Sequence, residues 1–297
     1  GNGTYSSVER KTIAQEMQGL RDQIFALANR EDSNGQPLFS ALGSALKPFV
    51  GPQASTPDYT FTGLPGQSTS TSLSIANALD GDSAFMLTPK RDAAYNVGLN
   101  NGNISLKTSA VSISDAAVVN GSSYNISNIR LTPGAASGTS KASYDLTETL
   151  AGSTTALPTI SASGPDFPST DKNIPLAVPG LSLTLTGTPS TGDTVSITSN
   201  ASLFSVLDKA ISGIGGASNN NTAAQAVSQA LYNIDIGMQR VSAARGQAGE
   251  LMNRADRISD NQEKRSTQME ADRSRVEDLD MVKGISDFQN QQSGLTA

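Results

Sequence analysis

Apolar residues recur at helical spacing over the last third of the chain. From Val227 to Ala255 the steps alternate between four and three residues, which is the heptad pattern of a helix that packs along one seam, and the helix is expected over residues 222 to about 288. Arg245 interrupts the pattern, and Gln262 and Ser266 occupy it where it thins beyond Ile258. We expect one long helix. Its packing seam consists of Val227, Leu231, Ile234, Met238, Val241, Met252, Ile258, Val276, Leu279 and Ile285.

A shorter helix is expected near the beginning of the chain. Ser6 and Glu9 have the spacing of a capping box, in which each side chain bonds the other residue's backbone amide. Asn34-Gly35 and Pro37 indicate a turn after this helix. Its apolar stripe has the same spacing as the long seam and consists of Ile13, Met17, Leu20, Ile24 and Leu27. Because the periods match, we expect the two helices to pack along their stripes; the alternative is that each packs on the middle of the chain.

The two stripes differ greatly in length. At about 1.5 Å per residue, the long helix extends roughly 90–100 Å, whereas the stripe from Ile13 to Leu27 extends roughly 22–24 Å. We therefore expect the stretch from Ile258 to Phe288 to be poorly buried within one chain. A further N-terminal helix and neighbouring subunits would cover it.

Between the helices the chain changes to short β-rich segments. Prolines at positions 48, 52 and 57 indicate an extended crossover over residues 38–63, and the proline-rich stretch 151–180 is expected to be a loop. The alternating segments predict strands at 59–62, 83–87, 95–99, 104–113, 117–119, 124–131, 142–149, 181–187 and 194–198. Short strands separated by turn residues favour an antiparallel sandwich or barrel.

The helical segments on either side of the β-rich middle define the predicted domains. Residues 203–214 form a short amphipathic helix, which we expect to cap the end of the helical bundle, and the long helix then begins at an Asn/Thr cap. The predicted fold class is α+β with two domains. A coiled-coil-like helical domain comprises residues 1–48 and 201–297, and an antiparallel β-sandwich or barrel is inserted at residues 49–200.

Composition excludes several classes of function. The 297 residues include no Cys, His or Trp, so thiol nucleophiles, Ser-His-Asp triads and the usual zinc sites are excluded. A net charge of −6 without a basic patch argues against nucleic-acid binding, and no apolar run reaches the roughly 18 residues that span a membrane. A glycosidase with two carboxylates stays formally open, although the chain offers few aromatic residues for stacking on sugars.

Two acidic pairs are candidate cation ligands. Asp80 with Asp82 and Asp278 with Asp280 lack the full spacing of a calcium loop, so a turn and a solvated helix end explain them better. No phosphate-binding glycine motif occurs. We therefore predict no catalytic, cofactor-binding or metal-binding residue, and no cofactor.

Several separated stretches share residues with one protein family. They are Gly1-Asn2-Gly3-Thr4, Leu20-Arg21-Asp22-Gln23, Asp32-Ser33-Asn34-Gly35, Leu38-Phe39-Ser40, Gly187-Thr188-Pro189, Ser202-Leu203-Phe204 and Val276-Glu277-Asp278-Leu279-Asp280. In order and spacing these stretches resemble the flagellar hook–filament junction proteins, the third hook-associated protein, which are themselves similar to flagellin. Pro37 and Ala41 depart from the family pattern, and the middle of the chain carries little of it.

The resemblance implies a non-enzymatic structural subunit of the bacterial flagellum, present here as a core fragment without the terminal regions. Such a protein is extracellular and is exported by the flagellar type III system without a cleaved signal peptide. It forms a ring with its own kind, with the first hook-associated protein and flagellin as neighbours and an export chaperone as a further partner. The alternatives are a flagellin filament subunit, a surface adhesin or binding module carried by the β domain, and, third, an enzyme.

Overall fold

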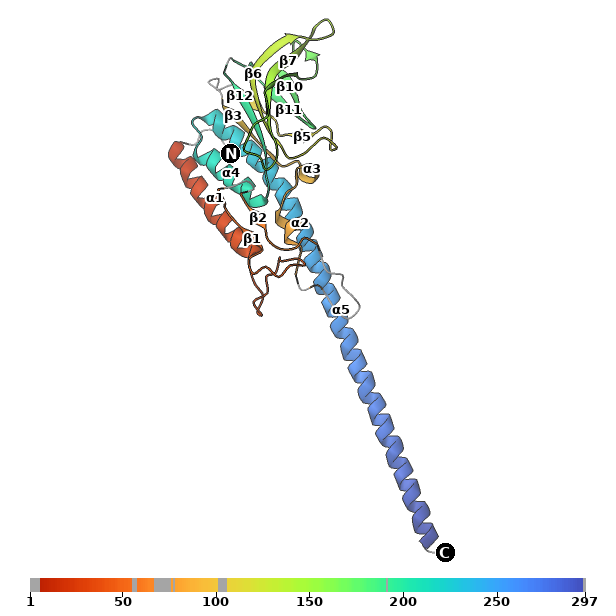
Figure 1. Ribbon diagram of the computed structural model, residues 1–297. Coiled ribbons are helices and arrows are strands. Elements are labelled where there is room, and N and C mark those ends of the chain that lie inside the picture. Colours follow the sequence, from red (N-terminus) through yellow and green to blue (C-terminus); the bar gives the residue numbers. More distant parts are fainter. Residues whose placement is uncertain are drawn as a thin grey trace. The chain divides into compact units, whose positions relative to one another are not determined.

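The computed structural model describes residues 6–54, 58–66, 76, 78–100, 106–190 and 192–295, with side chains up to residue 291. It contains both helices and antiparallel sheets (Figure 1). The chain divides into two compact units, Gly1–Ser68 with Ala78–Arg245 and Thr69–Asn77 with Gly246–Ala297. The Gly-Asn-Gly-Thr run at positions 1–4 and residues 104–105 of one predicted strand lie outside the described residues.

Helix α1 (Ser7–Ala28) begins at the predicted capping box. The Ser6 hydroxyl accepts a hydrogen bond from the Glu9 amide, and the Glu9 carboxylate accepts one from the Ser6 amide at 2.7 Å. The helix ends at Asn29, whose side-chain amide exchanges two hydrogen bonds with the backbone of Phe49, at 2.9 and 3.1 Å. The capping box thereby satisfies backbone amides that an isolated helix leaves without partners, and Asn29 fixes the end of the helix to strand residue Phe49.

Helix α4 (Leu203–Gly215) lies beside α1 (Figure 1). A Cβ at Gly215 would be 3.0 Å from the Ala14 Cβ, so the glycine permits the close approach of the two helices. Phe204 on α4 is fully buried, and its ring lies within 5.1–5.5 Å of four other aromatic rings. Those rings belong to Phe25, Phe49, Tyr59 and Phe85.

The expected pairing of α1 with the long helix is wrong. Among the described residues, α1 packs mainly on α4, and the predicted stripe is not its buried face. The buried positions Arg10, Ala14 and Ala28 lie beside the stripe. The two alanines permit closer helix contact than leucines do, and the Arg10 guanidinium donates to Asn220 and to the Ala217 carbonyl. Helix α4 is therefore a direct packing partner of α1 and not an end cap of the bundle.

The β strands form open antiparallel sheets, so the barrel alternative is not supported within the described residues. One sheet has the order β3 (Tyr95–Asn100), β12 (Thr194–Ser199), β6 (Ser123–Pro133), β7 (Thr139–Thr149) and β8 (Ile160–Ser163), with β9 (Phe167–Pro168) also pairing with β7. The second has the order β10 (Asn173–Val178), β11 (Leu181–Thr186) and β4 (Lys107–Thr108), with β5 (Ser112–Ile113) also pairing with β11. A small pair, β1 (Phe49–Val50) and β2 (Thr60–Phe61), lies beside α4.

Both large sheets contribute to one hydrophobic core. Strand β11 alternates buried and partly exposed residues, as a strand with one core-facing side does. Tyr144 on β7 is buried and donates its hydroxyl to the carbonyl of Ala177 on β10, which joins the two sheets. The largest fully buried side chains of this core are Tyr95, Tyr144, Leu106, Ile126, Ile174, Leu176, Leu181, Leu185 and Ile197.

Two strand predictions and one loop prediction were wrong, each for a local reason. Residues 83–87 overlap helix α2 (Gly81–Phe85), because Asp80 caps that helix by accepting from the amides of Asp82 and Ser83. Residues 117–119 form a turn in which the Asp115 carboxylate accepts from the Ala117 amide. The stretch 151–180 holds β8, β9 and β10, since β10 is the edge of its sheet, where Pro175 loses no interstrand hydrogen bond.

Helix α5 spans Asn220–Leu295. The Asn219 side chain accepts from the Thr222 amide at 2.9 Å, which confirms the predicted Asn/Thr cap. In the second unit, the side chains from residue 259 to 291 are all exposed. None of the described helices combines the length and apolar character that crossing a membrane requires.

Candidate helix-packing surface

The beginning of α5 presents a row of carboxamide side chains to the β strands. Asn221, Gln225, Gln229 and Asn233 are spaced four residues apart, so they share one face of the helix. We call these four residues the carboxamide row. All four donate to backbone carbonyls, and the acceptors are Leu106, Thr108, Ser109 and Tyr95, in that order, at 2.9–3.1 Å. The row therefore bonds one helix to strands of both sheets.

Gln225 makes the fullest set of contacts in the row. Its Oε1 accepts from the Thr108 amide at 3.2 Å, and its Nε2 donates to the Thr108 carbonyl and hydroxyl. These groups are buried, where an unmade hydrogen bond is costly. The row was not predicted because polar amides on a helix normally face solvent; their spacing of four residues was the available signal.

Small residues let α5 approach its neighbours closely. Ala223, Ala230 and Ala244 are buried, and a Cβ at Gly237 would lie 2.4 Å from the Leu203 Cδ1 atom on α4. The face of α5 that packs within the first unit is thus formed by small residues and carboxamides. Ile234 and Val241 of the predicted seam also pack against buried clusters, whereas Leu231 and Met238 are exposed.

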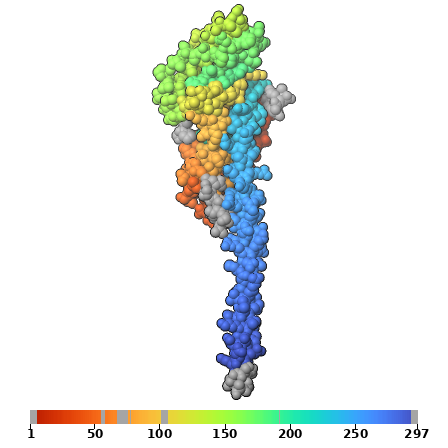
Figure 2. All heavy atoms as spheres, turned by 90° about the vertical axis from the view of Figure 1, so that its right-hand side faces the viewer, coloured from red at the N-terminus to blue at the C-terminus, as the bar shows by residue number. Residues whose placement is uncertain are grey.

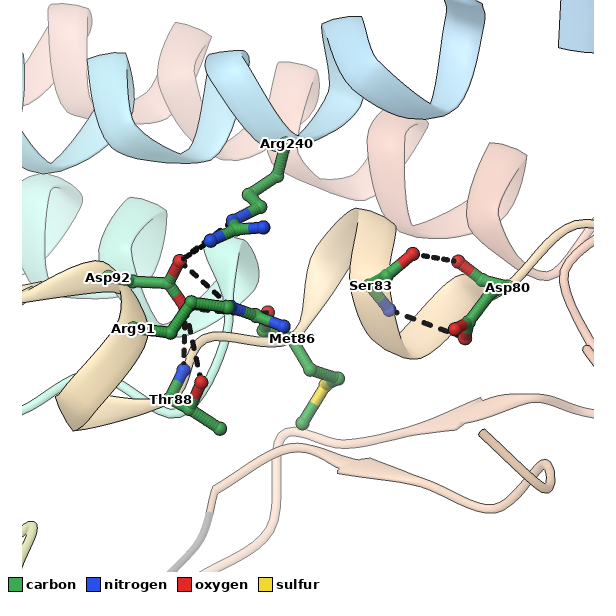
Figure 3. Close-up of polar contacts among 7 residues, drawn as sticks. All are labelled: Asp80, Ser83, Met86, Thr88, Arg91, Asp92 and Arg240. Carbon is green, nitrogen blue, oxygen red and sulfur yellow. Dashed lines mark hydrogen bonds and ion pairs between the residues drawn. The ribbon is translucent and has the colours of Figure 1, made fainter. Parts of the chain in front are cut away.

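A buried carboxylate ties helix α3 (Pro89–Asp92) to α5 (Figure 3). The Asp92 side chain is 1% exposed and pairs with Arg91 and Arg240 at 2.8 and 2.5 Å. It also accepts from the Thr88 amide at 2.7 Å. In Figure 2 the orange segment that carries α2 and α3 lies beside the cyan beginning of α5. This ion pair therefore joins residues 148 positions apart in sequence.

The same contacts set the pKa of Asp92. Burial raises it, but the hydrogen bonds from Arg91, the Thr88 amide and Arg240, together with the Arg91 charge, outweigh burial and hold the pKa of Asp92 below its usual range. The carboxylate is therefore ionised at neutral pH and fully engaged in structural contacts.

In the first acidic pair, the Asp80 carboxylate caps helix α2. The Asp80 carboxylate accepts hydrogen bonds from three backbone amides, those of Gly66, Asp82 and Ser83, at 3.0–3.3 Å. Figure 3 shows the bond from the Ser83 amide. Burial and the Asp80 charge raise the pKa of Asp82. Within the described ranges no three acidic side chains come together in a group that could hold a metal ion.

The predicted seam of α5 lies mostly outside the packed face. Val227, Ile234, Val241 and Ile258 are half-buried, whereas Leu231, Met238 and Met252 are 52–70% exposed. On α1, Ile13, Met17 and Ile24 are half-buried, and Leu20 and Leu27 are more than half exposed. The two stripes do not pair along their length, although Ile24 and Val241 pack against the same buried cluster around Phe204. Each stripe also has large apolar side chains that are exposed.

The second unit carries the rest of the predicted seam. Val276, Leu279 and Ile285 are 53–70% exposed, which confirms the expectation of poor burial from Ile258 to Phe288. Other large apolar side chains of the same stretch are equally accessible, namely Met269, Met281, Val282 and Phe288. We call these exposed residues the apolar row. They follow one another along the helix and point to more than one side of it. Contiguous exposed apolar surface of this kind marks interaction surfaces.

Comparisons with known proteins agree on one group of relatives, although no family model matches the chain. The sequence of this chain is 43% identical over 49 residues to flagellar hook-associated protein 3 of Salmonella typhimurium. The matched stretch is 16% of this chain and 16% of the relative. The sequence is 44% identical over 48 residues to the Escherichia coli protein of that name, 16% of this chain and 15% of the relative. The match thus spans about a sixth of the relatives' length.

Solved structures extend the likeness to most of the chain. A flagellar hook associated protein-3 from Legionella pneumophila has a TM-score of 0.60 at 23% identity, over 92% of this chain and 84% of that one. FlgL of Xanthomonas campestris has a TM-score of 0.56 at 21% identity. The match covers 86% of this chain and 80% of the Xanthomonas chain. The flagellar junction protein FlgL of L. pneumophila has a TM-score of 0.57 at 22% identity. The match covers 87% of this chain and 82% of the FlgL chain.

The sequence match and the structural match point to the same proteins. The short stretch of high identity confirms the resemblance to hook-associated protein 3 that the motifs indicated. The structural comparison shows the fold. The chain is thus similar in sequence to flagellar hook-associated protein 3 and has the fold of solved flagellar junction proteins.

Proposed function

We propose that this chain is a structural subunit of the bacterial flagellum that forms the junction between hook and filament by axial and lateral packing of helices. The relatives named above support the flagellar role. The observation that carries the proposal is the exposed apolar row of α5, with Val276, Leu279 and Ile285 as its central members.

The energetics of that row suit an assembly surface. Burying one large aliphatic side chain contributes about 1.5–3 kcal/mol. Several such side chains along one helix would therefore stabilise a subunit contact strongly, and leaving them in water has no structural advantage. The charged and polar residues between them keep the rest of the helix soluble before assembly.

The proposal includes a domain assignment and partners. Residues 1–48 and 201–297 form the helical domain that packs in the assembly, and residues 49–200 form the β domain inserted into it. The partners are further copies of this chain in a ring, the first hook-associated protein on one side and flagellin on the other, with a chaperone during type III export. The location is extracellular, and the chain has no catalytic role.

A matched pair of variants of the intact gene product tests the proposal. Ile285→Asp places a charge at an exposed apolar side chain, whereas Ser286→Asp places the same charge at the neighbouring, exposed polar side chain. Sedimentation with isolated hooks that carry the first hook-associated protein should show binding by the unchanged protein and Ser286→Asp, and at least a tenfold loss for Ile285→Asp. Equal binding by both variants would refute the role of the row.

The two alternatives give different outcomes in the same assay. A flagellin subunit would polymerise into long filaments. A surface adhesin would ignore hooks and instead bind a glycan or matrix protein through residues 49–200.

A further inference from the structure

A polar cavity of about 280 Å³ lies between β3, α4 and the beginning of α5. Its volume is just below the range of small-molecule pockets. Carboxamides of Asn200, Gln229 and Asn233 line one part of it, and aliphatic side chains such as Val97, Val206 and Ala230 line another. The lining thus combines polar and apolar side chains, as sites for small organic molecules do.

The polar side contains hydrogen-bonding atoms without partners among the described residues. Asn200 is 2% exposed, and neither its Oδ1 nor its Nδ2 is bonded. Gln229 and Asn233 each use their amino group in the carboxamide row, which leaves Gln229 Oε1 and Asn233 Oδ1 unpartnered. Buried polar atoms in proteins nearly always have partners, so these three side chains offer hydrogen bonds to whatever occupies the cavity.

The charge of the lining limits what that species is. Lys209 is the one charged residue that lines the cavity among those described, and its ammonium donates to Thr198 Oγ1 and the Ser199 carbonyl, at 3.4 and 3.2 Å. Burial lowers the pKa of Lys209, and the nearby Asp58 carboxylate opposes that shift. A cation would lie beside this ammonium, and an anion would face three carbonyl oxygens.

We propose that this cavity binds a small uncharged molecule rich in hydroxyl groups, such as a polyol. A hydroxyl group both donates and accepts a hydrogen bond. Several hydroxyls on one molecule can therefore donate to the three unpartnered carboxamide oxygens and accept from the Asn200 amino group. The carbon chain of the polyol would lie against the aliphatic lining. This site is independent of the apolar row and of the proposed role in assembly.

Saturation-transfer NMR on the full chain with ribitol as the probe tests the proposal. We expect saturable binding by the unchanged protein and at least a tenfold weaker affinity in Asn200→Ala and in the apolar, similarly sized Asn200→Leu. Neither replacement removes a hydrogen bond between the described residues, so circular dichroism should show folded protein. Asn261→Ala, which changes an exposed asparagine, should bind ribitol normally.

Two results would overturn the proposal. One is the absence of saturable ribitol binding by the unchanged protein, or equal binding by the Asn200 variants. The other is a crystal structure of the ribitol-soaked protein in which the cavity contains only separate water molecules. Continuous density for ribitol in contact with Asn200 and Gln229 would support it.

Discussion

Arg240 on α5 pairs with the buried carboxylate of Asp92 on α3, with 2.5 Å between Nη2 and Oδ1. The same carboxylate oxygen accepts from Arg240 Nε at 2.7 Å. A short helix of four residues has little stability of its own, so this contact fixes its position on the long helix. The pair thereby stabilises the point where the chain passes from α3 into strand β3.

Replacing Asp92 with asparagine should destabilise the protein. The change leaves two arginines and the Thr88 amide without their anionic partner, at a cost of about 2–3 kcal/mol. Urea denaturation followed by circular dichroism measures the change in the free energy of unfolding. Asp260→Asn, on an exposed part of α5, should alter it by less than about 0.5 kcal/mol.

The contribution of Asp92 should depend on pH. Its pKa is lower in the folded state than in the unfolded state, so its stabilisation is complete above the unfolded value of about 3.9 and is lost as the pH falls through the folded value. The difference in unfolding free energy between the unchanged protein and Asp92→Asn should therefore shrink below about pH 4. A difference that stays constant down to about pH 2 would show that the ionised carboxylate is not the stabilising species.

Replacing Gln225 with alanine tests the carboxamide row. The variant loses the contacts with the backbone and hydroxyl of Thr108 and leaves buried polar groups of that residue unbonded, so it should be less stable by about 2–3 kcal/mol. Gln247→Ala, at an exposed position of the same helix, is the matched control and should be nearly neutral. Comparable stability of the two variants would mean that the row contributes little.

Gly237 provides a test of close helix packing. An alanine there places its Cβ 2.4 Å from Leu203 Cδ1 and 3.3 Å from Cγ, next to the buried aromatic cluster around Phe204. Overpacking costs about 1–3 kcal/mol, whereas alanine improves helix propensity by about 1 kcal/mol. Gly246→Ala meets nothing within 4 Å and should stabilise the helix. A thermal melt should place Gly237→Ala below Gly246→Ala; the reverse order would contradict the packing.

Local signals in the sequence predicted helix ends and many strands correctly. Ser6 with Glu9, and Asn219 with Thr222, act through neighbours three residues away, so their geometry is encoded in a short stretch. Strands β3, β6, β7, β11 and β12 likewise follow the alternation of their own residues. The turn at Asp80 was interpreted correctly, but the short helix that it caps was taken for a strand.

The packed faces could not be predicted in the same way. Large apolar residues such as Leu20 and Leu231 dominate a periodicity, yet the structure exposes them and buries Ala14, Ala230 and Gly237. A small residue gives a weak hydrophobic signal although it allows the closest contact between backbones. The carboxamide row and the Asp92–Arg240 pair depend on strands and helices far away in sequence, which no local pattern reveals.

The most direct test of the proposed role is the length of material that the intact gene product adds to isolated hooks carrying the first hook-associated protein. Electron microscopy at increasing protein concentration measures that length. A junction subunit should add one layer of constant height, however much protein is supplied. Growth that continues with concentration into long filaments, or no addition at all, would contradict the account.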